Sequence, residues 1–182
     1  MGMIYLNNED INIQGVIEKW AEERPNLKDF LKKLDLESLL GYDEHVQSTL
    51  IGQVNQVLSQ MKDVQTQAEF IGACSRGFMA NYLNDPSVII NKIFEKFGEK
   101  NPFNGKDIFN FYAENKMFRT FSTLPSEFDL EEILSEKGAV LQTATIQSYS
   151  AILRTWVETN QHFVVVGPEG CGKGVLIKDA FS

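Results

Sequence analysis

The residues with the clearest chemical signature form a glycine-rich run near the end of the sequence. They are Gly167, Pro168, Glu169, Gly170, Cys171, Gly172 and Lys173. The spacing matches the phosphate-loop pattern GxxxxGK[ST] at both outer glycines and at the lysine. Glycines let a backbone fold tightly enough for successive N–H groups to face phosphate oxygens, and a following helix N-terminus adds unpaired donors. The lysine would reach the β- and γ-phosphates. The run therefore predicts a site for ATP or ADP.

The last position of the pattern departs from it, because Gly174 stands where Ser or Thr is usual. That hydroxyl normally ligates Mg²⁺, which neutralises the charge that develops during phosphoryl transfer. We expect residues 167–174 to bind nucleotide, with a doubtful role for Mg²⁺ and weak or absent hydrolysis. We assign no catalytic residue and no metal ligand.

A phosphate loop has to follow a strand and open a helix, and both neighbours are predicted here. Phe163–Val166 is a continuous run of apolar residues, three of them valines, which is typical of a strand buried on both faces. Residues 175–181 favour the first turns of a helix. The sequence ends nine residues after Lys173, so we expect an incomplete ATPase whose own affinity for nucleotide is very weak.

The preceding residues are predicted to be mostly helical, because apolar residues repeat at three- and four-residue spacing. Helices are expected around residues 13–21, 27–40, 46–61, 68–83, 88–97, 128–135 and 146–157. Gly41 is predicted to end the second of these helices, and Thr143 to cap the last. Met3–Leu6 favours a strand, and residues 101–125 fit short strands or packed loops. The pattern predicts a helical unit, 1–138, followed by the first β–loop–α unit of an α/β domain, 139–182.

Composition narrows the classes of function. The net charge of −8, with no basic face to offset it, argues against a nucleic-acid partner. Cys74 and Cys171 are the two cysteines, and they lack the spacing of a zinc site. The sequence has no apolar run near 18 residues and no secretory signal at its start, so we expect a cytosolic protein without a membrane span.

Two stretches of the sequence resemble a known family. The run GPEGCGKG at residues 167–174, followed by apolar residues and then Ala180-Phe181-Ser182, resembles the P-loop of the third AAA+ module of dynein heavy chains. Within that family it is most similar to the cytoplasmic dynein 2 class, the motors of retrograde intraflagellar transport. Gly2-Met3-Ile4-Tyr5, and the helix with Val16 and Trp20, resemble the second module just after its arginine-finger region.

The resemblance implies a fold and a set of partners. Residues 1–138 would be the end of the second module's large domain and its AAA+ helical lid, and residues 139–182 would open the third module. Val140 and Leu141 would contribute to the adenine pocket, although ordinary core positions are an equal alternative. The partners would be the rest of the dynein ring and other dynein chains, with microtubules reached only through parts absent from this sequence. The location would be the cytoplasm and cytoskeleton, in a cilium or flagellum.

Two other interpretations fit the same residues. The chain could come from a different P-loop NTPase that has a helical N-terminal domain. It could also be a non-catalytic helical interaction module whose glycine loop binds no phosphate.

Overall fold

The computed structural model describes residues 11–83, 85–103, 108–114, 116–122 and 140–182. Contacts divide the chain into two units, Met1–Pro102 and Phe103–Ser182. The strand predicted at residues 3–6, the helix predicted at 128–135 and the boundary predicted at 138 lie outside the described residues, so they stay predictions.

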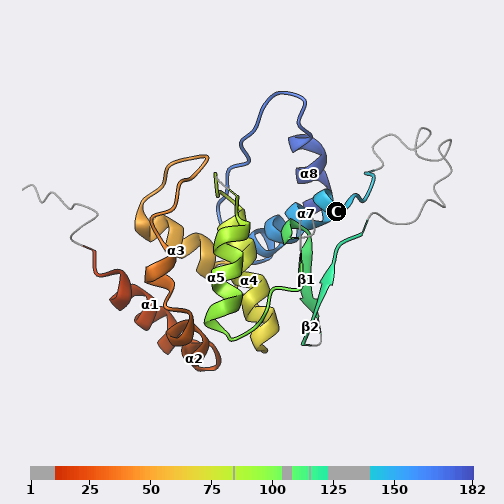
Figure 1. The fold of residues 1–182 in the computed structure, drawn as a ribbon. Coiled ribbons are helices and arrows are strands. Elements are labelled where there is room, and N and C mark those ends of the chain that lie inside the picture. Colours follow the sequence, from red (N-terminus) through yellow and green to blue (C-terminus); the bar gives the residue numbers. More distant parts are fainter. Residues whose placement is uncertain (1–10, 84, 104–107, 115, 123–139) are drawn as a thin grey trace, which may run out of the picture. The chain divides into compact units, whose positions relative to one another are not determined.

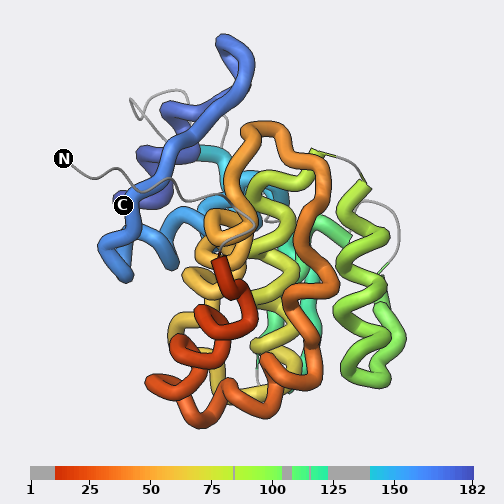
Figure 2. Tube along the Cα trace, turned by 90° about the vertical axis from the view of Figure 1, so that its left-hand side faces the viewer, coloured from red at the N-terminus to blue at the C-terminus, as the bar shows by residue number. Residues whose placement is uncertain are grey.

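The first unit is mainly helical in its described part, which confirms the expectation of a mainly helical fold (Figure 1). Its elements are α1 (Ile13–Glu22), α2 (Pro25–Leu34), the 3₁₀ helix η2 (Leu36–Leu39), α3 (Leu50–Leu58), α4 (Gln67–Met79) and α5 (Ser87–Lys96). Helix α4 packs against α3 and α5, and it lies between them in Figure 2. Helix α1 packs against α2 and α3.

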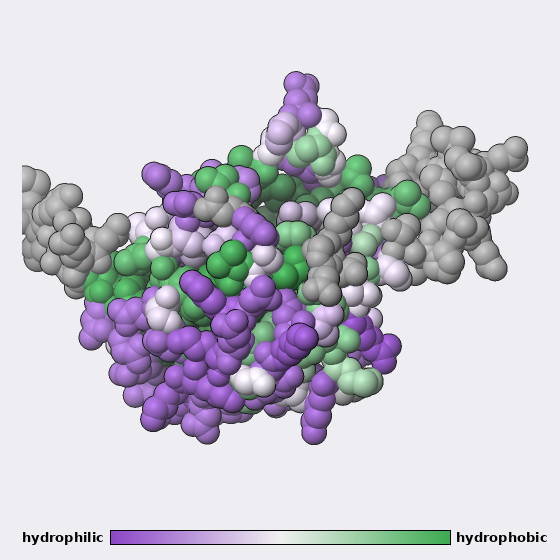
Figure 3. Space-filling view, viewed as in Figure 1, coloured by the Kyte–Doolittle hydropathy of each residue, from purple (hydrophilic) through white to green (hydrophobic). Residues whose placement is uncertain are grey.

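Helix α4 carries much of the core of this unit. Its Phe70, Ile71 and Phe78 are fully buried, and the Phe70 ring packs against those of Phe30 and Phe97, with centroids 5.3 and 5.6 Å apart. Burying rings of this size removes a large apolar area from water, which is the main stabilising contribution to such a core. By contrast, the surface over α1 and α2 is mostly hydrophilic (Figure 3).

A close approach of two backbones joins α3 to α4. A Cβ atom added to Gly77 would lie 2.6 Å from the Cα atom of Val57, so only glycine fits at this point. The side chain of Gln56 donates a hydrogen bond of 2.6 Å to the Gly77 carbonyl and fixes the same contact. The absence of a side chain at Gly77 therefore sets the spacing between these helices.

The helix predicted at residues 27–40 is interrupted in the structure. Helix α2 ends at Leu34 because Asp35 adopts a left-handed conformation with φ 52°, and a 3₁₀ turn follows. The break places Leu34 and Leu36 in the core together, at 0% and 2% exposure. The prediction of Gly41 as the cap of this helix was therefore wrong, although Gly41 does have a positive φ of 77°.

Local capping explains where α4 begins. The Thr66 hydroxyl accepts the Glu69 N–H at 3.3 Å, and the Glu69 carboxylate accepts the Thr66 N–H at 2.9 Å, which together form a capping box. Glu69 also accepts the Gln65 N–H at 2.9 Å. The Gln65 hydrogen bond, followed by those from Thr66, lowers the pKa of the Glu69 carboxyl below its usual value.

The second unit contains a hairpin and two helices in its described residues. Strands β1 (Phe111–Glu114) and β2 (Met117–Thr120) pair antiparallel, with Phe111 opposite Thr120 and Glu114 opposite Met117. Short strands were one of the two possibilities left open for this region. Helices α7 (Ala144–Glu158) and α8 (Lys173–Ala180) pack against each other.

The strand predicted at Phe163–Val166 is not formed in this structure. Val164 and Val166 are 85% and 66% exposed, and no described residue pairs with their backbone. A strand exists only through hydrogen bonds to a neighbouring strand, and the two described strands already pair with each other. The structure therefore supplies the loop and the helix of the predicted β–loop–α unit, but not its strand.

In the part of the chain that the structure describes, no helix has the length and apolar character needed to cross a membrane.

Candidate nucleotide-binding loop

The glycine-rich run forms an open loop that leads directly into α8 (Figure 1). Gly170 and Gly172 have φ values of 76° and 91°, which L side chains rarely adopt, although a Cβ atom at either position would meet nothing within 4 Å. Both positions therefore need glycine because of their backbone conformation, and not for lack of space.

The start of α8 exposes backbone donors beside this loop. The first intrahelical hydrogen bond runs from the Leu176 N–H to the Gly172 carbonyl at 3.0 Å. The N–H groups of Lys173, Gly174 and Val175 precede it, so they have no partner within the helix. Together with the positive end of the helix dipole, they make this end of α8 suited to an anion.

Lys173 folds back across the loop. Its ammonium donates hydrogen bonds to the carbonyls of Gly167 and Pro168, at 2.8 and 2.7 Å, and a longer one to the sulfur of Cys171, at 3.8 Å. It forms no ion pair with any described residue. An ammonium has three N–H donors, and the third is directed at the Cys171 sulfur, a weak acceptor that a phosphate oxygen could replace. The positive charge is thus held at the loop without being neutralised.

The other residues of the run lie at the surface or close the loop. A Cβ atom at Gly167 would lie 2.8 Å from the Cys171 sulfur, which shows how closely the two ends of the loop approach each other. Pro168, Glu169 and Cys171 are exposed, so the Glu169 carboxylate is accessible to solvent, as expected for a side chain that points outward.

Gly174 occupies the position where the usual pattern has a hydroxyl side chain. It lies in the first turn of α8, is exposed, and has no atom within 4 Å of its Cβ direction. The structure therefore has room for a serine or threonine at this position, and the missing hydroxyl is a property of the sequence and not of the packing.

Val140 and Leu141 lie just before α7 and are not core residues. Val140 is half-buried and Leu141 is 46% exposed, which leaves apolar surface open on this segment. The next residue, Gln142, donates a side-chain hydrogen bond to the carboxylate of Asp179 on α8. The structure thus places Gln142 beside α8, the helix that follows the glycine-rich loop.

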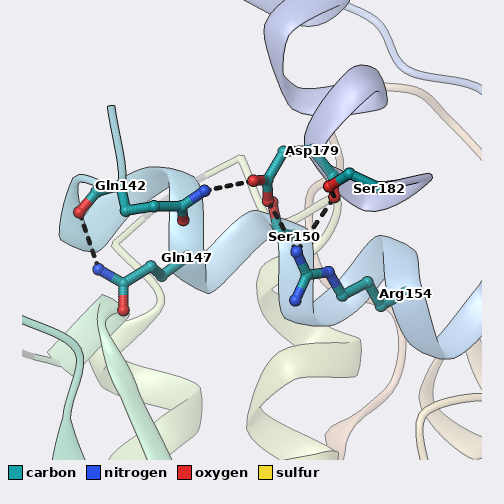
Figure 4. Close-up of polar contacts among 6 residues, drawn as sticks. All are labelled: Gln142, Gln147, Ser150, Arg154, Asp179 and Ser182. Carbon is teal, nitrogen blue, oxygen red and sulfur yellow. Dashed lines mark hydrogen bonds and ion pairs between the residues drawn. The ribbon is translucent and has the colours of Figure 1, made fainter. Parts of the chain in front are cut away.

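Asp179 is the centre of a polar cluster that sequence reasoning missed (Figure 4). Its side chain is buried, at 3% exposure, and accepts hydrogen bonds from the Ser150 hydroxyl at 2.5 Å and from Arg154 at 3.3 Å, in addition to that from Gln142. Arg154 also donates to the Asp179 carbonyl at 3.1 Å, and Ser182 donates to it at 2.8 Å.

A buried carboxylate is stable only when its charge is paired and its oxygens accept hydrogen bonds, and this cluster provides both. One signal for it was present in the sequence. Ser150 and Arg154 are four residues apart, on one face of the predicted helix, and an acidic residue interrupts the apolar run after the loop.

No family model matches this sequence, but several known proteins match it along its whole length. Six relatives match along at least 99% of the chain, and all six are heavy chains of dynein. The chain therefore belongs to the dynein heavy-chain family.

The relatives are named cytoplasmic dynein 2 heavy chain 1. The chain is 31% identical to the protein of Homo sapiens over 198 residues, 29% identical to that of Mus musculus and 26% identical to that of Tripneustes gratilla. Each alignment covers 100% of the chain and 5% of the relative, so the chain spans about one twentieth of the length of these proteins. The resemblance inferred from residues 167–174 is confirmed at the level of the family and of this class.

Proposed function

We propose that residues 167–174 form the phosphate half of an ATP- or ADP-binding site in the AAA+ ring of a dynein heavy chain. The observation that carries this proposal is the loop in which Gly170 and Gly172 take left-handed conformations immediately before α8 while Lys173 lies across it. The names of the relatives support a role in a dynein motor, and we extend this to microtubule-based transport in cilia.

The loop offers an anion three kinds of attraction. The first amides of α8 are unpaired within the helix, the helix dipole is positive at this end, and the third ammonium donor of Lys173 meets only the weak sulfur acceptor of Cys171. No described carboxylate pairs with Lys173, so a phosphate would not have to displace one. These features favour the terminal phosphates of a nucleotide as the ligand.

We propose further that this site binds nucleotide without efficient hydrolysis. Gly174 supplies no hydroxyl for Mg²⁺, and no group of three or more potential metal ligands occurs among the described residues. In this view Val140 and Leu141 contact the base, because they are apolar, partly exposed and held beside α8 through Gln142.

The rest of the ring would complete the site. The exposed valines 164 and 166 lie in a segment with strand character, and pairing with strands elsewhere in the heavy chain would bury them. We therefore propose the remaining dynein modules and other dynein chains as partners, with no direct contact between this segment and a microtubule.

Titration of the ¹⁵N-labelled chain with ATP, followed by NMR, tests the phosphate loop even when affinity is weak. We expect shifts centred on the amides of residues 167–176. Lys173→Ala should weaken binding about tenfold or more, because it removes a charged hydrogen-bond donor to phosphate. Lys178→Ala is the matched control, because it removes a lysine from the last turn of the same helix. The proposal fails if Lys173→Ala binds like the wild type, or if neither protein binds at millimolar ATP.

A further inference from the structure

Helix α7 anchors the phosphate-loop segment at both of its ends. At the first end, the ring of Trp156 stacks on that of Phe163, with centroids 5.9 Å apart and an interplanar angle of 26°. At the other end, Ser150 and Arg154 bind Asp179, on the last turns of α8. The position of the loop is therefore set by α7, although the loop itself packs little against its surroundings.

Gln142 is a third anchor, and it belongs to a different segment. Its side-chain amide donates to one carboxylate oxygen of Asp179, Oδ1, while Ser150 and Arg154 use the other oxygen, Oδ2 (Figure 4). Its own carbonyl accepts a hydrogen bond of 2.9 Å from Gln147, in the first turn of α7. Gln142 is thus held at both its backbone and its side chain.

The two carboxylate oxygens of Asp179 therefore hold different parts of the structure. The Oδ2 contacts hold α8 on α7, and they do not involve the residues that precede α7. The Oδ1 contact ties Gln142, and with it the neighbouring Val140 and Leu141, to α8. Residues 140–142 are the segment proposed to contact the base. Of the contacts drawn in Figure 4, the one from Gln142 to Asp179 joins this segment directly to α8.

We infer that Gln142 and Asp179 are positioning residues that set the distance between the base side and the phosphate side of the nucleotide site. The inference rests on the proposed function. A nucleotide spans both sides, whereas inorganic triphosphate occupies the phosphate side alone. The hydrogen bond between Gln142 and Asp179 should therefore matter for ATP and not for triphosphate.

The experiment compares these two ligands on the same proteins by NMR titration of the whole chain. Gln142→Ala should weaken ATP binding about fivefold, the effect of one lost hydrogen bond, and should leave inorganic tripolyphosphate binding unchanged. Ser150→Ala is the matched control, because it removes a hydrogen bond to the same carboxylate but keeps the tie to Gln142. It should change the binding of both ligands by the same factor.

Two results would overturn the inference while leaving the phosphate loop intact. In one, Gln142→Ala binds ATP as tightly as the wild type; in the other, it weakens both ligands equally, which would indicate a general structural role. Failure of the proposed function gives a different result. In that case tripolyphosphate does not bind the wild type, or binds Lys173→Ala equally well.

Discussion

Replacing Gly77 with alanine tests the close contact between α3 and α4. The added methyl group would be placed 2.6 Å from the Cα atom of Val57, well inside the roughly 3.5–4.0 Å of an ordinary carbon–carbon contact. The neighbouring atom belongs to the backbone, so it cannot rotate away as a side chain could. The two helices must therefore move apart by about 1 Å.

Three contributions set the expected size of the effect. Overpacking of this kind costs about 1–3 kcal/mol. Separation of the helices also weakens the 2.6 Å hydrogen bond from Gln56 to the Gly77 carbonyl, which costs about 1 kcal/mol. Alanine offsets about 1 kcal/mol of this, because it favours the helix over glycine. We expect Gly77→Ala to lower the free energy of unfolding by about 2 kcal/mol.

Urea unfolding provides the measurement, with tryptophan fluorescence as the readout. Trp20 lies in the first unit and Trp156 in the second, so a Trp156→Phe background leaves Trp20 to report on the unit that contains Gly77. Gly52→Ala, in α3, is the control, because the nearest neighbours of its methyl group would be side-chain atoms of Ser48 and Thr49, at 3.2–3.4 Å, and not the backbone of another helix. It should change stability by less than about 1 kcal/mol. If Gly77→Ala is as stable as the wild type, the inferred close packing is wrong.

The remaining predictions concern a metal ligand and a helix cap. Gly174 has room for a side chain, so Gly174→Ser should bind ATP at least about threefold more tightly when Mg²⁺ is added. If Mg²⁺ changes the ATP affinity of wild type and variant equally, a hydroxyl at this position does not ligate Mg²⁺. The pKa of Glu69 is lowered in the folded protein, so its contribution to stability is present above the unfolded pKa and is lost as pH falls through the folded pKa. When the pH is lowered from about 6 to about 3, the free energy of unfolding, measured with urea, should therefore fall less for Glu69→Gln than for the wild type. If it falls equally for both proteins, the capping assignment is wrong.

Much of the helical unit could be predicted because its signals are local. Apolar spacing located α1, α4 and α5, and Thr143 caps α7 as expected, with its hydroxyl accepting the Ile146 N–H at 3.2 Å. These signals act within one or two helical turns, so they are written in adjacent residues. The break at Asp35 was not predicted, because it depends on burying Leu34 and Leu36 against other helices.

In the candidate site, too, the part made of adjacent residues could be predicted and the part made of distant residues could not. Its glycines, its lysine and the missing hydroxyl at Gly174 could be picked out from their spacing alone, because the loop is one continuous segment whose backbone conformation depends on its own residues. The cluster around Asp179 could not, because its partners Gln142 and Ser150 lie 37 and 29 residues away along the chain. Only folding brings them to one carboxylate.

The sequence by itself therefore indicated the family of the protein and the helical character of its first part, and it predicted a nucleotide site in the loop at residues 167–174. These depend on residue type and on short-range spacing. Tertiary structure decided how closely Gly77 approaches α3, which side chains surround Asp179, and that none of the described residues forms a strand with Phe163–Val166. Each of these depends on neighbours distant in the chain, since a buried charge, a close helix contact and a strand are stable only in the presence of their partners.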